Sequence, residues 1–117
     1  MSPVSDWRFY DTIYTERFMG TPDQNAEGYD AGSLLNEADG LEAPFLLIHG
    51  MADDNVHPQN SMRLVSALQD AGKDFQLMVY PNKAHSIAGA QTRLHLYTTM
   101  RDFWHRHLLP IQAPAGR

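Results

Sequence analysis

PFLLIHGMADDNVH, which runs from Pro44 to His57, is the stretch that decides the fold. Its four consecutive apolar residues, 45–48, are typical of a short strand that is buried on both faces of a parallel sheet. We expect His49 and Gly50 to end this strand. The polar residues that follow would then lie at a carboxyl strand end, where open α/β sheets place their ligands and catalytic groups. The stretch therefore predicts an α/β fold with a site in the loop after Gly50.

A second junction between a strand and a loop lies at FQLMVY, residues 75–80, and the PNKAH that follows places His85 just beyond it. Adjacent parallel strands bring such loops together, so we expect Asp53 and His85 to meet. An acid after one strand and a histidine after the next match the last two members of the order Ser, Asp, His in α/β-hydrolases. In that chemistry the histidine accepts the nucleophile's proton, and the buried carboxylate orients the imidazole.

The nucleophile of such a triad is missing from the chain. No serine lies in a GxSxG pattern; the serines are Ser2, Ser5, Ser33, Ser61, Ser66 and Ser86. The sequence contains no cysteine, which excludes a thiolate nucleophile, zinc thiolates and disulfides. The residues alone therefore predict an acid and a base without the group that they would activate.

Metal binding is the alternative for the same loop. His49, Asp53, Asp54 and His57 are residue types that zinc or manganese accepts as ligands. Their spacing matches neither a helix-borne HExxH nor a calcium loop. We expect no metal and no cofactor in this chain.

Helices are expected to alternate with the two strands. Their predicted ranges are residues 5–19, 29–38, 58–71 and 92–108. Ser5 or Asp6 is expected to cap the first helix and Gly20 to stop it, whereas Gly32 weakens the second. Residues 110–117 are expected to be disordered.

Tyr10, Ile13, Tyr14 and Phe18 keep helical spacing in the first helix and form one aromatic face. A stripe of this kind usually packs into a core. The helix at 92–108 has a similar apolar side, made of Leu96, Tyr97, Met100, Phe103, Trp104 and Leu108.

Composition limits the possible partners. A net charge of −5 without basic clusters argues against nucleic acid, and no apolar run approaches the length of a membrane span. At 117 residues the chain holds one small domain. Two parallel strands make a sheet too small to stand alone, so we expect either pairing between copies or a larger parent domain.

Three motifs in order resemble the dipeptidyl peptidase IV branch of the prolyl oligopeptidase family of serine peptidases. They are PVSDWRFYDTIYTERFMG, LLIHGMADDNVH and YPNKAHSI, and the similarity extends from Pro3 to about Leu109. The resemblance implies that residues 1–117 are the C-terminal portion of an α/β-hydrolase domain. The family's nucleophile elbow, its oxyanion donors and its β-propeller, which carries the acidic pair for the substrate's amine, would lie outside this chain.

The resemblance assigns roles residue by residue. Asp53 would be the triad acid, His85 the general base, and Asn55 a donor to a substrate carbonyl. Val4, Trp7, Tyr10 and Tyr14 would line a pocket for proline or alanine, which makes the aromatic face pocket wall rather than core. The family also dimerises through its last helix and the preceding strand, here Val79, Tyr80 and the helix after Thr92, so a homo-oligomer is expected.

The resemblance therefore predicts a serine exopeptidase that releases N-terminal Xaa-Pro or Xaa-Ala dipeptides. This chain would act in it together with the rest of the catalytic domain and a β-propeller. The chain alone is expected to be inactive, since nothing in it can be activated for attack. The alternative is a non-catalytic interaction or dimerisation module derived from such an enzyme.

Overall fold

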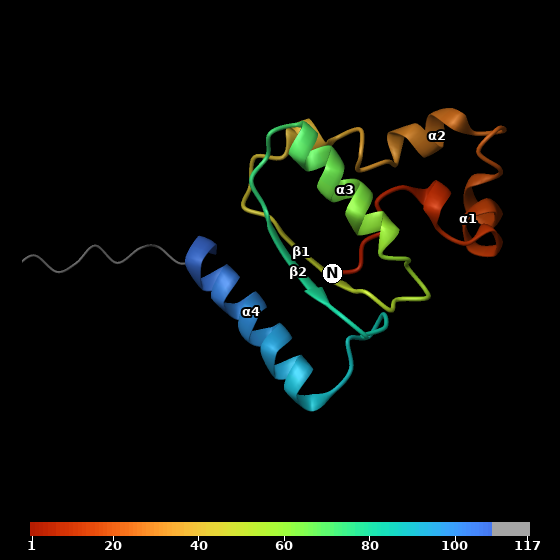
Figure 1. Cartoon of the computed structure of the whole chain (residues 1–117). Helices are drawn as coiled ribbons and strands as arrows, with labels where there is room; N and C mark the ends of the chain where they lie inside the picture. The colour runs from red at the N-terminus through yellow and green to blue at the C-terminus, as the bar shows by residue number, and fades with distance from the viewer. Residues whose placement is uncertain (109–117) are drawn as a thin grey trace, which may run out of the picture. The chain divides into compact units, whose positions relative to one another are not determined.

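The computed structural model describes residues 1–108, which fall into two compact units, 1–86 and Ile87 onward. The first unit contains a two-stranded parallel sheet, β1 (Leu46–Gly50) and β2 (Gln76–Tyr80), joined through helix α3 (Gln59–Asp70) (Figure 1). This βαβ arrangement confirms the predicted α/β fold.

Strand β1 is longer at its carboxyl end than the sequence indicated. His49 pairs with Val79, and Gly50 pairs with Tyr80, so both residues belong to the strand that they were expected to end. The strand is buried from Leu47 onward, as its apolar composition predicts.

The core of the first unit lies where α3 covers the sheet. Leu64 and Leu68, one helical turn apart, pack with Leu47 of β1 and with Ala38. Ala38 belongs to a short 3-10 helix, η2 (Ala38–Gly40), which contacts α3. Pro58 precedes α3 as its N-cap residue, and Gly72 follows it with a φ of 65°, a conformation that suits glycine.

The expected helix over residues 5–19 is wrong in its first half. The segment forms a 3-10 turn, η1 (Trp7–Phe9), and then helix α1 (Thr12–Met19). Each has its own cap: an Asp6 oxygen accepts from the Arg8 amide at 2.8 Å, and an Asp11 oxygen accepts from the Tyr14 amide at 2.7 Å. Two capping aspartates therefore divide the segment. Gly20 ends α1 with a φ of 71°, as predicted.

The expected helix over residues 29–38 is also misplaced. Helix α2 spans Ala26–Ala31, because Asn25 caps it by accepting from the Gly28 amide at 3.2 Å. The chain leaves the helix at Gly32, its C-cap.

The second unit contains helix α4 (Ala90–Leu108). On the apolar side that the sequence indicated, Leu96 is buried, but Tyr97, Trp104 and Leu108 are exposed. The tail at 110–117 lies outside the described residues. None of the helices in residues 1–108 is long and apolar enough to cross a membrane.

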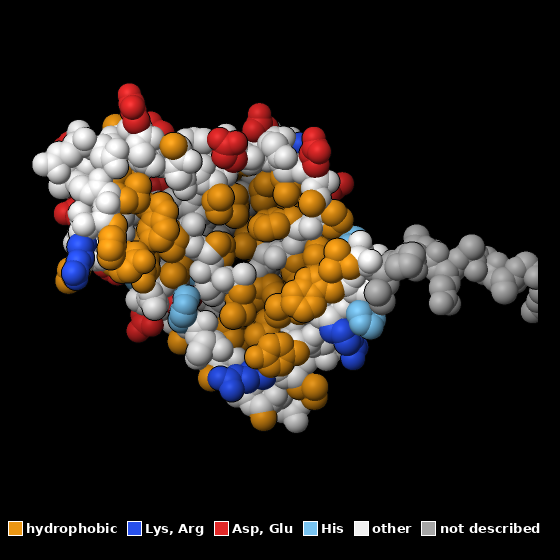
Figure 2. All heavy atoms as spheres, turned by 180° about the vertical axis from the view of Figure 1, so that it is seen from behind, with side chains coloured by type: hydrophobic (Ala, Val, Ile, Leu, Met, Phe, Trp, Pro, Cys, Tyr) orange, Lys and Arg blue, Asp and Glu red, His pale blue; other side chains and the backbone are white. Residues whose placement is uncertain are grey.

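Large apolar side chains reach the surface of both units, as the space-filling view shows (Figure 2). In the first unit they include Ile13, Tyr14 and Phe18 of α1, with 87%, 52% and 69% of their surface exposed. Leu77 and Val79 of β2 are also exposed. The aromatic face of α1 is therefore not core within this chain.

Candidate active site

The two loops that follow the strands are joined through their backbones. The Met51 amide donates to the Tyr80 carbonyl at 2.9 Å, and the Ala52 amide donates to the Lys83 carbonyl at 3.0 Å. The Lys83 carbonyl also lies so close to the Cα of Gly50 that a Cβ there would overlap it, and the Ala84 carbonyl would be 2.7 Å from that Cβ. Gly50 is thus required by the close approach of the loop that carries His85.

Asp53 is the centre of the site. Its side chain is fully buried, and one carboxylate oxygen, Oδ1, accepts from the Asn55 and Val56 amides at 3.0 Å each. The other oxygen, Oδ2, lies 2.9 Å from Nδ1 of His85. Burial raises the pKa of this carboxyl, but the hydrogen bonds from His85 and the two amides outweigh it and hold the pKa below its ordinary value. Asp53 is therefore a carboxylate at neutral pH.

His85 is the exposed member of the pair, with 46% of its side chain accessible. Because Asp53 is ionised and can only accept, Nδ1 of His85 carries the proton of their hydrogen bond. In the neutral ring this leaves the lone pair on Nε2, the nitrogen that can accept a proton from another group. The contact between the two side chains confirms the prediction that Asp53 and His85 lie side by side.

A second histidine, His49, also lies against Asp53, and the sequence did not indicate this contact. His49 is fully buried, with Nδ1 at 2.6 Å from the Ser61 hydroxyl and Nε2 at 2.8 Å from the Val56 carbonyl. Nε2 also lies 3.3 Å from Oδ2 of Asp53. The only available signal was a histidine inside a buried strand directly before an acidic loop.

An aromatic cluster lies beside the loop of residues 51–58, which carries Asp53 and is called the acid loop below. The rings of Trp7 and Tyr14 stack with centroids 6.2 Å apart, and Tyr10 meets each of them edge-on, at 5.9 and 5.8 Å. Phe18 continues the row, 5.1 Å from Tyr14. These offset and edge-on contacts are the arrangements that aromatic side chains prefer.

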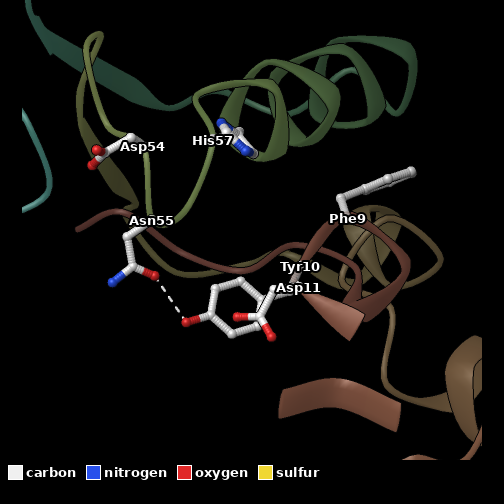
Figure 3. Close-up of a pocket in the computed structure, with 6 residues that line it drawn as sticks. All are labelled: Phe9, Tyr10, Asp11, Asp54, Asn55 and His57. Atoms are coloured by element: carbon white, nitrogen blue, oxygen red, sulfur yellow. Dashed lines mark hydrogen bonds between the residues drawn. The ribbon is translucent and has the colours of Figure 1, made fainter. Parts of the chain in front are cut away.

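Tyr10 connects this cluster to the acid loop. Its hydroxyl donates to Oδ1 of Asn55 at 2.8 Å, and the amide nitrogen of Asn55 points away from the ring (Figure 3). That nitrogen remains available as a donor to another molecule.

The same two residues belong to the wall of an open pocket. The pocket has a volume of about 540 Å³ and is lined by Phe9, Tyr10, Asp11, Asp54, Asn55 and His57 (Figure 3). A second hollow of about 230 Å³ is lined by Trp7, Tyr14, Thr15, Phe18 and Met19. Val4 is half-buried and lines neither of them.

The segment of residues 5–9, which carries Trp7, is fixed to α3 by Asn60, and Asn60 is fully buried. Its side-chain oxygen accepts from the Ser5 amide at 3.0 Å, and its nitrogen donates to the Phe9 carbonyl at 3.2 Å. Residues 5–9 are thereby held beside the start of α3, although more than 50 residues separate them along the chain. The sequence did not indicate this contact.

The proposed metal ligands do not form a cluster. Both nitrogens of His49 contact protein atoms, and His57 lines the open pocket of about 540 Å³. Within residues 1–108 no three histidine, aspartate or glutamate side chains gather as metal ligands would.

The comparisons with known proteins decide the family. The sequence profile of the prolyl oligopeptidase family matches residues 1–110. The chain belongs to this family. It is 45% identical to dipeptidyl peptidase 4 of Bos taurus over 106 residues, which cover 88% of this chain and 14% of the relative. It is 51% identical to the probable dipeptidyl-aminopeptidase B of Metarhizium robertsii over 90 residues, which cover 75% of this chain and 10% of the relative.

A solved structure agrees. The crystal structure of Porphyromonas gingivalis dipeptidyl peptidase 4 matches the chain with a TM-score of 0.89 and 50% sequence identity. The match covers 92% of this chain and 15% of that one. The resemblance to the dipeptidyl peptidase branch and the α/β-hydrolase fold are therefore confirmed. The chain spans no more than 15% of the length of these members of the prolyl oligopeptidase family.

Proposed function

We propose that this chain supplies the acid and the base of a serine-type dipeptidyl peptidase that releases Xaa-Pro or Xaa-Ala dipeptides from peptide N-termini. The observation that carries the proposal is the 2.9 Å contact between His85 and a buried, ionised Asp53 at adjacent strand ends. The names of the relatives, dipeptidyl peptidase 4 and dipeptidyl-aminopeptidase B, support the choice of reaction.

The chemistry follows from the two ring nitrogens of His85. A serine that lies outside residues 1–117 would attack the substrate carbonyl while Nε2 of His85 takes its proton. The same nitrogen then protonates the leaving amine, and later activates the water that hydrolyses the acyl-enzyme. Asp53 stabilises the imidazolium at each step and keeps the ring in the Nδ1–H form.

The aromatic cluster supports the substrate assignment. The flat faces of Trp7, Tyr10 and Tyr14 suit a proline ring, and the proline nitrogen has no amide hydrogen that would require an acceptor. Val4 lines neither hollow in this chain, so a place for it in this wall would depend on the rest of the catalytic domain. The free amide nitrogen of Asn55 would donate to a carbonyl of the substrate.

The remaining parts of the enzyme would come from elsewhere. The rest of the catalytic domain would bring the serine and the oxyanion donors, and a β-propeller would bring the acidic pair for the substrate's amine. The exposed Leu77 and Val79 of β2 are consistent with further chain, or a second copy, against this sheet. Residues 1–117 would thus be the C-terminal portion of the peptidase domain, and they would be inactive alone.

The test is hydrolysis of glycyl-prolyl-p-nitroanilide by a longer protein that contains this sequence. We expect His85→Ala to lower kcat by at least about 10³-fold, because no other base replaces Nε2. His105→Ala is the matched control, since this histidine is exposed on α4, and its activity should equal that of the native protein. Activity that survives in His85→Ala would refute the assignment, and the 117-residue chain alone should release no p-nitroaniline.

The alternative is a non-catalytic interaction module, which the exposed apolar residues of α1 and α4 favour. This reading predicts that the longer protein is inactive with every Xaa-Pro substrate. It also predicts that the 117-residue chain self-associates, which sedimentation equilibrium would measure.

A further inference from the structure

The buried side chain of His49 lies between three elements of the site. Its ring is on β1, Ser61 is on α3, and Val56 and Asp53 are in the loop between them. His49 and Ser61 are both completely inaccessible to solvent, and the Asp53 side chain is as well. A polar group buried to this extent normally has a hydrogen-bonding role.

The neighbours of His49 determine where its proton lies. Nε2 faces two oxygens, the Val56 carbonyl at 2.8 Å and Oδ2 of Asp53 at 3.3 Å. Both can only accept, so a lone pair on Nε2 would be repelled, and the nitrogen must carry hydrogen. Nδ1 faces the Ser61 hydroxyl at 2.6 Å, which can donate. The neutral Nε2–H form of the ring therefore satisfies every contact.

We infer that His49, held in its Nε2–H form by the oxygens of Val56 and Asp53 and partnered at Nδ1 by the Ser61 hydroxyl, is a positioning residue that fixes the carboxylate of Asp53 toward His85. The catalytic part of this inference rests on the proposed peptidase function.

Val56 links His49 to Asp53 through both of its backbone polar groups. The Val56 amide donates to Oδ1 of Asp53, while the Val56 carbonyl accepts from His49. His49 thus holds the peptide segment that fixes one carboxylate oxygen, and its Nε2–H also lies beside the other oxygen. Without this donor, the buried Val56 carbonyl loses its partner and the loop is free to shift. A shift of Asp53 changes the orientation of the His85 ring.

Ser61 completes the contacts of the tautomer that the two oxygens at Nε2 require. In the Nδ1–H form Nε2 would point a lone pair at two oxygens. In the Nε2–H form the lone pair lies on Nδ1, and the Ser61 hydroxyl donates to it. Ser61 therefore supplies the buried donor that Nδ1 needs in the tautomer that holds the acid loop.

The first experiment is long-range ¹H–¹⁵N correlation spectroscopy of the imidazole groups in the 117-residue chain at neutral pH. We expect His49 in the Nε2–H form and His85 in the Nδ1–H form. Observation of His49 as Nδ1–H or as the imidazolium would overturn the inference directly.

Substitutions then separate positioning from packing. His49→Gln places an amide nitrogen near the position of Nε2 and should keep His85 as Nδ1–H. His49→Phe fills the site without a donor, so the His85 ring should become a mixture of tautomers. Ser61→Ala tests the same link without changing the buried ring, and the exposed Ser66→Ala on the same helix is its control. Unchanged His85 tautomers in both His49→Phe and Ser61→Ala, with the fold intact by circular dichroism, would refute the inference.

Kinetics of the longer protein connect the inference to catalysis. His49→Phe should lower kcat about 10-fold or more with KM within about 2-fold of native, and His49→Gln should restore most of the loss. Equal kcat in all variants would refute the catalytic role. If the native protein were inactive, the proposed function would fail, but the tautomer measurements would still decide whether His49 positions Asp53.

Discussion

Gly50→Ala tests whether the close approach of the two loops holds the histidine in place. The new Cβ would be 2.7 Å from the Ala84 carbonyl and nearer still to that of Lys83, whereas real Cβ atoms essentially never come within 3.0 Å of such an atom. Both oxygens are backbone atoms, so the loop cannot relieve the overlap by changing a rotamer. The segment that carries His85 must move away from β1.

The magnitude follows from what that movement breaks. The Ala52 amide to Lys83 carbonyl bond, 3.0 Å long, crosses the same gap and would lengthen out of hydrogen-bonding range. Overpacking of this kind costs about 1–3 kcal/mol, and a lost backbone hydrogen bond adds about 0.5–1.5 kcal/mol. We therefore expect Gly50→Ala to lower the free energy of unfolding by roughly 2–4 kcal/mol.

Urea unfolding of the 117-residue chain, followed by circular dichroism, measures this change. Gly40→Ala is the matched control, because a Cβ at Gly40 meets nothing within 4 Å. This variant should range from unchanged to about 1 kcal/mol more stable. In the longer protein, displacement of His85 should also lower kcat about 10²-fold. Equal stability of Gly50→Ala and Gly40→Ala would refute the reasoning.

Two further predictions concern the acid loop. The pKa of Asp53 is lower in the folded chain than its ordinary value, so its ionised form stabilises the fold above the unfolded-state pKa, and this contribution is lost as pH falls through the folded-state pKa. We therefore expect the free energy of unfolding of the native chain, measured with urea between about pH 5 and pH 2, to approach that of Asp53→Asn as the pH falls. A difference between the two proteins that stays constant with pH would contradict this prediction. Tyr10→Phe removes the donor that orients the Asn55 amide, and should raise KM for glycyl-prolyl-p-nitroanilide about 3-fold or more with little change in kcat. In an Asn55→Ala background the same substitution should have almost no effect, and additive effects would show that the two residues act separately.

The sequence predicted the parts of the structure that depend on local pattern. The apolar run 45–48 and the amphipathic stretch at 58–71 indicated β1 and α3, because their periodicity reflects burial in this same chain. The meeting of Asp53 and His85 followed from parallel neighbouring strands alone.

The errors lie where a distant contact or a second cap decides the conformation. Ser5 was expected to cap a helix, but its amide donates to Asn60 and its carbonyl accepts from the Leu34 amide. The helix begins only after Asp11, which caps it instead. No local pattern distinguishes Asp6 from Asp11 as the cap, since both are favourable residues.

Burial was also misjudged where apolar spacing was the only guide. Ile13 and Phe18 keep helical spacing but stay exposed, because helical spacing shows which residues share a face and not what covers that face. For His49 the sequence missed a buried residue instead of predicting burial wrongly. Its two ring nitrogens are hydrogen-bonded to Ser61 and Val56, and only the folded chain brings these partners together.

The loop that carries His85 approaches Gly50 of β1 with two carbonyl oxygens, those of Lys83 and Ala84. Any residue that keeps the backbone conformation can supply the same two oxygens, so this contact does not depend on which side chains stand at positions 83 and 84. The exposed side chain of Ala84 is therefore a site for an attached fluorophore or spin label, next to the histidine but outside the contacts that hold it.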